Sequence, residues 1–305
     1  MPASQLVIVP RSARQNVVIS GRLSLLRHSL PRVLLGLLCA FALFISRPAS
    51  AQTLAYLEVI QDNHLWEVAA WDGTFQQRGT LTFPTATSMA GSSGTSYIVD
   101  QSKLWKVDLS NTRTQLGTGD WSGLTNMDSG GDNSSPSVFK LFVTQNSRLW
   151  SVNRTTGAFA QLGGVDWAGA TSLACGIVGG QRYVYIIQNS RLWRVDPGNG
   201  AFTQLGGPDW AGQTRMTFDF DTSSLYVVQG NALWRVNPST GAFQQLGSSV
   251  WSGATSITAP GSGFGLFIIQ NSRIYKVNSS SGAFTAITGP DFGGATQMTS
   301  RTVTI

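Results

Sequence analysis

The stretch QNSRLWRVDPGNGAFTQLGGPDW, from Gln188 to Trp210, recurs in variant form along most of the chain. Its Leu-Trp-x-Val core spans Leu192 to Val195 and has five further copies. The second residue of the core is Trp66, Trp105, Trp150, Trp193, Trp234 and Tyr275 in the six copies. Successive copies are 39, 45, 43, 41 and 41 residues apart. A period near 40 residues that combines short strands with glycine-rich turns is typical of propeller blades.

Each repeat contains four candidate strands. The first is an apolar run (residues 183–187), and the two turn residues Asn189 and Ser190 join it to the second (191–195), which carries Trp193. A turn that ends at Gly200 leads to the third strand (201–205). After a Gly-Asp-Trp type of link comes a strand of small residues, such as 170–173 or 254–257. Small side chains suit the crowded strands around a propeller axis, so this last strand is predicted to be the inner strand of the next blade.

The two ends of the repeat array predict how the ring closes. The first repeat begins at residues 56–60 without a preceding inner strand, while the chain ends on such a strand at 295–299. That C-terminal strand should complete the N-terminal blade and so protect both edges. The predicted fold is all-β: a single six-bladed β-propeller of four-stranded blades over residues 52–305. Residues 129–137 form one turn-rich insertion.

Residues 1–51 have the pattern of a signal peptide. A basic region that ends at Arg32, an apolar run at 33–45 and the small residues Ala49, Ser50 and Ala51 occur in the expected order, and residues 1–51 contain six arginines and no acidic residue. Cleavage after Ala51 would leave an exported protein, periplasmic or extracellular, with no membrane span. The whole chain has 21 basic and 15 acidic residues, so removal of six arginines leaves 15 of each. This balance argues against a nucleic-acid partner, because phosphate contacts need excess positive charge.

The residues after the signal peptide offer little for catalysis. They include one histidine, His64, two glutamates, Glu58 and Glu67, and one cysteine, Cys175. Repeated acid and base pairs are therefore unavailable, and a Ser-His-Asp arrangement would depend entirely on His64. Cys175 stands in a small, apolar stretch, where a buried and inert thiol is the default expectation. The protein is predicted not to be an enzyme.

Metal binding is also weakly indicated. Two groups of residues could supply oxygen ligands to calcium: Asp128, Asp132 and Asn133, and Asp219 and Asp221. Neither group has the spacing of a defined calcium loop. No cofactor or metal ion is predicted.

Two aromatic series recur with the repeat. The Leu-Trp-x-Val series lies inside a strand among apolar neighbours, so it is predicted to be core between blades. The second series stands in the links between blades, where binding residues often concentrate. It consists of the pairs Asp120-Trp121, Asp166-Trp167, Asp209-Trp210, Val250-Trp251 and Asp291-Phe292.

Two interpretations of the second series stay open. A ring beside a carboxylate can bind a sugar, because the ring stacks on the pyranose and the carboxylate accepts hydrogen bonds from hydroxyl groups. Alternatively, the ring packs between blades and the aspartate caps a turn. Retention of an aromatic ring next to Val250 slightly favours packing. A third series, Lys103, Arg148, Arg191 and Arg273, follows the first hairpin turn and is either solvated or part of a rim site.

Because each short repeat has a strand that carries Trp and a turn that ends in Gly, the chain resembles the tectonin or tachylectin type of β-propeller over residues 52–305. The LW[RKSE]V core, followed by a turn and Gly-Ala-Phe, departs from the Trp-Gly pairing of tectonin repeats. This resemblance implies a secreted, lectin-like protein that binds glycans or cell-surface glycoconjugates at repeated, weak sites between blades, which multivalency makes effective. The Arg, Glu and aromatic set of six-bladed fucose lectins cannot repeat in this chain, because Glu58 and Glu67 are the only glutamates after residue 51. Two alternatives remain: a protein-interaction scaffold without sugar binding, and an enzyme or metal site in the central cavity.

Overall fold

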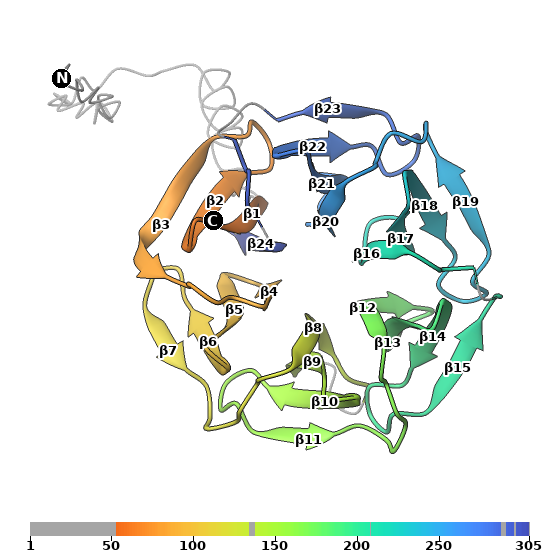
Figure 1. Ribbon diagram of the computed structural model, residues 1–305, viewed down its shortest axis with the longest axis horizontal. Coiled ribbons are helices and arrows are strands. Elements are labelled where there is room, and N and C mark those ends of the chain that lie inside the picture. Colours follow the sequence, from red (N-terminus) through yellow and green to blue (C-terminus); the bar gives the residue numbers. More distant parts are fainter. Residues whose placement is uncertain (1–52, 134–137, 208, 288–290, 296, 305) are drawn as a thin grey trace, which may run out of the picture. The chain divides into compact units, whose positions relative to one another are not determined.

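The computed structural model describes residues 53–304 except 134–137, 208, 288–290 and 296. The predicted signal peptide lies outside the described residues. In the described part, four-stranded antiparallel sheets form six blades around a central axis (Figure 1), which confirms the predicted six-bladed propeller. No helix among the described residues is both long and apolar enough to cross a membrane.

In each blade the four strands follow one another from the axis outward. Blade 1 contains β24 (Gln297–Thr304), β1 (Thr53–Gln61), β2 (His64–Ala69) and β3 (Phe75–Thr82). Blade 2 contains β4 (Ser88–Ser92), β5 (Thr95–Asp100), β6 (Lys103–Val107) and β7 (Arg113–Gln115). Blade 3 contains β8 (Leu124–Gly131), β9 (Phe139–Gln145), β10 (Arg148–Asn153) and β11 (Phe159–Gln161).

The other three blades repeat this order. Blade 4 contains β12 (Ala170–Val178), β13 (Gln181–Gln188), β14 (Arg191–Val195) and β15 (Phe202–Leu205). Blade 5 contains β16 (Gln213–Asp219), β17 (Ser224–Gln229), β18 (Ala232–Val236) and β19 (Phe243–Leu246). Blade 6 contains β20 (Ala254–Thr258), β21 (Leu266–Gln270), β22 (Arg273–Val277) and β23 (Phe284–Ala286).

Ring closure occurs as predicted, by pairing of the last strand with the first. β24 pairs antiparallel with β1, from Thr53 opposite Thr304 to Ile60 opposite Gln297. The strand begins two residues later than predicted and runs to Thr304. This pairing gives blade 1 its inner strand and protects the edge of β1, which would otherwise be open to association.

Turn chemistry fixes the strand registers. Asn189 and Ser190 have φ of 49° and 65°, the left-handed geometry of a two-residue hairpin. Gly200 has φ of 77°, and a Cβ there would lie 2.5 Å from the backbone nitrogen of Gly163 in the preceding blade. Glycine is therefore required on both conformational and steric grounds. The predicted insertion is partly a strand, because Ser129–Gly131 continue β8.

The hydrophobic core lies between adjacent blades. One example is the cluster in which Leu192 and Leu205 of blade 4 pack with Leu225 and Val236 of blade 5. The two faces of β14 divide as alternation predicts, because Leu192 joins this cluster while Val195 joins the cluster shared with blade 3. Burial of apolar area between blades is the main stabilising contribution to such a ring.

Candidate functional site

The predicted aromatic site in the links is buried. The five rings are 1–3% exposed, at Trp121, Trp167, Trp210, Trp251 and Phe292. Each belongs to a core cluster between two blades; Trp210, for example, packs with residues of blades 4 and 5. A ring in this position exposes no free face for a pyranose in this structure, so its burial gives no support to sugar stacking, which stays a prediction. The alternative interpretation, packing between blades, agrees with their burial.

Hydrogen bonds explain why these links keep an Asp-Trp pair. The backbone N–H of Trp167 donates to Ser147 O of the preceding blade at 2.7 Å. Asp166 Oδ1 accepts the N–H of Ala168 at 2.8 Å and so caps the turn. The side chain of Gln188 then donates to the carbonyl oxygens of Asp166 and Ala168 at 2.9 and 2.7 Å. Sequence reasoning missed the role of this glutamine.

The same contacts recur at other junctions. Asp120 and Asp291 cap their turns through the N–H groups of Ser122 and Gly293. Asp209 contributes its carbonyl oxygen, which accepts a hydrogen bond from Gln229 Nε2 at 2.7 Å. These aspartates are therefore structural in their observed contacts.

The predicted rim cations are solvent-exposed and lie beside the same links. Arg148 donates to Gln161 Oε1 at 2.6 Å, and Arg191 donates to Gln204 Oε1 at 3.1 Å. Lys103 and Arg273 are also exposed. These contacts agree with solvated side chains, and the buried rings beside them offer no stacking surface with which they could form a shared site.

The first aromatic series is less buried than predicted. Trp193 is partly exposed, whereas Trp167 in the adjoining link is buried. Phe202, the first residue of β15, lies between them with ring centroids 5.5 Å from Trp193 and 5.9 Å from Trp167. This outer phenylalanine recurs, with 39–48% exposure, at Phe75, Phe159, Phe202, Phe243 and Phe284. The phenylalanine of the Gly-Ala-Phe motif thus covers the buried link ring, a role that a single repeat does not reveal.

The two ends of the blades differ in chemistry. Because the blades are antiparallel, the turns between first and second strands and between third and fourth strands lie at one end, which we call the turn face. The turns between second and third strands, such as Asn189-Ser190, and the links between blades lie at the other end, which we call the link face. In the described part of the chain, the large exposed apolar side chains in turns of the turn face are Trp71, Leu109, Val138 and Phe220, and exposed Phe139 is the first residue of β9. The one large exposed apolar residue in a described link is Val250.

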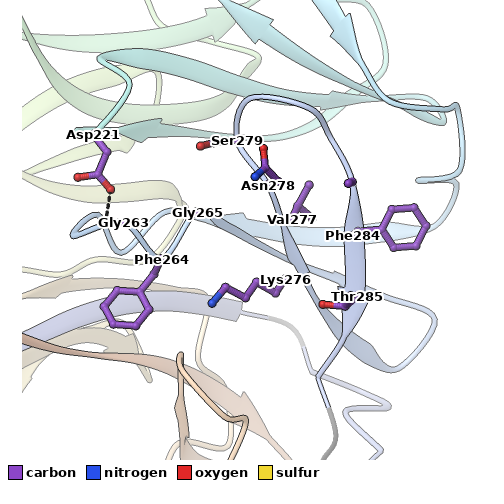
Figure 2. A pocket seen from close by; sticks show the side chains of 11 residues that line it. Asp221, Gly263, Phe264, Gly265, Lys276, Val277, Asn278, Ser279, Phe284 and Thr285 are labelled. Atoms are coloured by element: carbon purple, nitrogen blue, oxygen red, sulfur yellow. Dashed lines mark hydrogen bonds between the residues drawn. The ribbon is translucent and has the colours of Figure 1, made fainter.

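Cavities also open on the turn face. One of about 380 Å³ lies between blades 5 and 6 and is lined by Asp221, Phe264 and Lys276 (Figure 2). Lys276 Nζ lies 5.6 Å from the Phe264 ring centroid, and Asp221 Oδ2 accepts the N–H of Gly263 at 2.7 Å. A comparable cavity of about 390 Å³ in blade 5 is lined by Arg235, whose Nε donates to Ser224 Oγ at 3.0 Å.

A buried ionic network occupies the corresponding part of blade 1. Each of its four strands contributes one charged residue, and the ion pairs join Glu58 to Arg78 and to Arg301, and Glu67 to Arg301. Arg301 Nε lies 2.8 Å from Glu58 Oε1. In the other five blades, the residue in the position of Glu58 is aromatic: Tyr97, Phe142, Tyr185, Tyr226 and Phe267. The two glutamates noticed in the sequence are therefore part of the ring closure.

Titratable groups do not form a metal-binding cluster in the described residues. No group of three or more His, Cys, Asp or Glu side chains there could hold a metal ion. His64 contacts Gln77 Nε2 through Nδ1 at 3.3 Å at the surface. Burial raises the pKa of the Cys175 thiol well above its usual value, which keeps this group protonated and unreactive.

Comparison with known proteins agrees with the fold. No family model matches the sequence, and no curated protein matches it. Among solved structures, the chain is similar to one in a nidogen/laminin complex, with a TM-score of 0.64 and 12% identity over 81% of this chain and 98% of that chain. It is also similar to PorZ, an essential surface component of the type-IX secretion system of Porphyromonas gingivalis, with a TM-score of 0.51 and 13% identity over 75% of this chain and 32% of that chain.

A third similar structure is YCF48 bound to a D1 peptide, with a TM-score of 0.48 and 13% identity over 78% of this chain and 82% of that chain. Identities this low show a common fold alone. The protein is thus a β-propeller with six four-stranded blades. The tectonin-type resemblance stays a prediction.

Proposed function

We propose that this protein is an exported, non-catalytic scaffold that binds a partner protein through its turn face. The observation that carries the proposal is that turns of several blades expose apolar side chains on this face, two of which, Phe139 and Phe220, line one axial cavity, while the described links of the opposite face expose Val250. Exposed apolar groups of this size mark interaction surfaces when they lie together on one side of a molecule. Aromatic residues are also enriched in the cores of protein interfaces.

The rest of the turn face suits a protein partner. Its cavities of about 380 and 390 Å³ place cationic side chains beside aromatic rings and polar turns. Such a mixture matches an interface in which apolar contacts form the centre and polar groups surround it. Two of the similar structures are a nidogen/laminin complex and a secretion-system surface component, and both fit an interaction role.

Glycan binding through the Asp-Trp links has less support than binding of a protein. Rings that are 1–3% exposed would have to leave the core to stack on a sugar. The scaffold alternative raised by the sequence is therefore the function that the geometry supports best.

Photo-crosslinking in the cells that produce the protein tests this proposal. A benzophenone amino acid is introduced at Phe220 or Leu109 on the turn face, with Val250 on the link face as the matched control. All three residues are exposed, so each substitution is expected to leave the fold intact. The proposal predicts a discrete crosslinked protein from the two turn-face positions and none from Val250. Crosslinks from Val250 alone, or none from either turn-face position, would overturn it.

A further inference from the structure

The propeller axis contains a funnel that opens on the turn face. Its wide part is a cavity of about 350 Å³, and a narrower cavity of about 80 Å³ continues along the axis. The two cavities share four lining residues, Asp128, Thr217, Thr258 and Thr299. These four side chains mark the level at which the funnel narrows.

Strand register places these four residues at one height. Asp128 pairs with Phe142 in blade 3, and Thr217 pairs with Tyr226 in blade 5. Thr258 and Thr299 pair with the equivalent residues of blades 6 and 1. One carboxylate and three threonines from four inner strands therefore line the funnel at the same level. Thr299 Oγ1 accepts the N–H of Gly91 at 2.8 Å, and Thr258 Oγ1 lies 3.0 Å from Ser300 Oγ.

Above this level, toward the turn face, the funnel wall carries both apolar and polar side chains, the polar ones being Ser92, Ser93, Ser129, Ser300, Arg301 and Thr302. Its lining includes Phe139, Ile177, Phe218, Phe220 and Pro260. Phe218 is buried, while Phe139 and Phe220 are 41% and 52% exposed at the mouth. The funnel thus combines a wall that includes aromatic rings with a polar floor, and ligand sites commonly combine apolar and polar groups in this way.

Asp128 is the unusual group of the floor. Its two carboxylate oxygens accept the N–H groups of Ser129 and Cys175, both at 2.8 Å. None of the ion pairs found among the described residues involves this carboxylate. Desolvation by burial raises the pKa of Asp128 to about 6, and the hydrogen bonds that oppose this rise come from backbone N–H groups. At neutral pH the carboxylate is therefore charged, and no ion pair among the described residues compensates it.

Two cations at or near the funnel, Arg301 and Arg154, already contact other groups. Arg301 is paired with Glu58 and Glu67. Arg154 lies over the Phe139 ring at 5.0 Å and donates to Ser92 Oγ at 2.5 Å. Arg215 lines the narrower cavity beyond the floor. Cys175, the other titratable group at Asp128, stays a neutral thiol because burial raises its pKa.

We propose that the axial funnel binds a primary ammonium group on an unbranched alkyl chain, as in a lysine side chain of the partner protein. This assignment rests on the proposed function of the turn face and names what that face recognises. The ammonium supplies the missing counter-charge to Asp128 and has three donors for the carboxylate and the threonine hydroxyls. The methylene groups lie against the phenylalanine rings at the mouth. A guanidinium group is planar and larger, which suits the narrowing at the floor less well.

Titration with Nα-acetyl-lysine methylamide, followed by ¹H–¹⁵N NMR of the full mature protein, tests this site without the partner. The amide signals of Ser129 and Cys175 report directly on binding at Asp128, because both N–H groups donate hydrogen bonds to its carboxylate. We expect saturable shifts of both signals near pH 7.5, with affinity at least about tenfold weaker near pH 5, where Asp128 becomes protonated. The uncharged analogue Nα-acetyl-norleucine methylamide should produce no saturable shift.

Two variants complete the test. Asp128→Asn should weaken binding at least about tenfold, whereas Asp221→Asn, an exposed acid on the same face, should change it less than about twofold. Thr217→Val provides a second funnel variant if Asp128→Asn does not fold, and it should also weaken binding. Absence of saturable shifts, or equal binding of the norleucine analogue, would overturn the assignment. Because the probe needs no partner, a blank titration together with positive turn-face crosslinks would reject the funnel assignment and keep the proposed function.

Discussion

Replacing Arg301 by leucine should destabilise the ring more than any other single loss of a charged residue in blade 1. Arg301 is 5% exposed and holds both Glu58 and Glu67, which lie directly opposite each other on β1 and β2. Without Arg301, the Glu67 carboxylate keeps the hydrogen bond from Gln76 Nε2 at 3.1 Å. Two buried carboxylates would then face each other with reduced compensation.

The expected cost follows from the removal of one partner from a buried ion pair, about 3–5 kcal/mol. For a domain of this size, each kcal/mol lowers Tm by roughly 2–4 °C, so Arg301→Leu should lower Tm by roughly 6–20 °C. Thermal unfolding measured by circular dichroism gives this value. The control Arg273→Leu removes an exposed arginine and should change stability by less than about 0.5 kcal/mol.

A double variant separates the ionic effect from packing. If the loss comes from uncompensated charge, Glu67→Gln in the Arg301→Leu background should restore part of the stability, because one buried negative charge disappears. The reasoning about ring closure is refuted if the free energy of unfolding of Arg301→Leu lies within about 1 kcal/mol of the wild-type value.

Three further predictions concern other parts of the ring. The free energy of unfolding should fall by up to about 3 kcal/mol as pH rises from about 4 to 6. The reason is that the pKa of Asp128 is about 6 in the folded protein against an ordinary 3.8, so the folded protein binds this proton more tightly than the unfolded chain does. Urea unfolding at a series of pH values should show this fall in the wild type and not in Asp128→Asn. Trp210→Ala should cost about 3–5 kcal/mol in the same assay, since it leaves a cavity between two blades, and a loss below about 1 kcal/mol would contradict the packing role. Gly157→Ala should destabilise by more than about 1 kcal/mol, because φ is 74° and the new Cβ would lie 2.4 Å from the backbone carbon of Leu116; unchanged stability would show that the turn can relax.

The architecture could be predicted because it depends on local signals repeated six times. Asn189 and Ser190 specify a tight hairpin, Gly200 specifies a left-handed turn, and the missing inner strand of the first repeat requires one from the C-terminus. Each of these signals acts within one repeat or follows from counting strands. The structure confirms the blade number and the closing pair.

The chemistry of the surfaces could not be read in the same way, because it depends on contacts between repeats. The ring of Trp167, in the link between blades 3 and 4, is covered by Phe202 of blade 4, and its backbone N–H donates a hydrogen bond to Ser147 O of blade 3. Period-two alternation in one strand cannot show either contact. Likewise Arg301 and Glu58 are 243 residues apart in sequence, and only ring closure brings them together.

Asp128 illustrates the same limit at the axis. Its sequence neighbours suggested a calcium ligand, but the axial position follows from the register of β8 with β9 and from the inner strands of three other blades. The exposed side chains of the turn face, such as Phe220 and Leu109, belong to different blades and have no common motif. That they lie at the same end of their blades becomes visible only when the blades are arranged around the ring.

The most direct test of the turn-face scaffold is the affinity of its variants for the protein captured by crosslinking at Phe220 and Leu109. Calorimetry of the purified pair should show that Phe220→Ser and Leu109→Ser each weaken binding about tenfold or more, since exposed apolar groups at an interface centre contribute over about 1 kcal/mol each. Val250→Ser on the link face should leave the affinity within about twofold. Equal effects of all three substitutions, or a loss confined to Val250→Ser, would contradict the assignment of binding to the turn face.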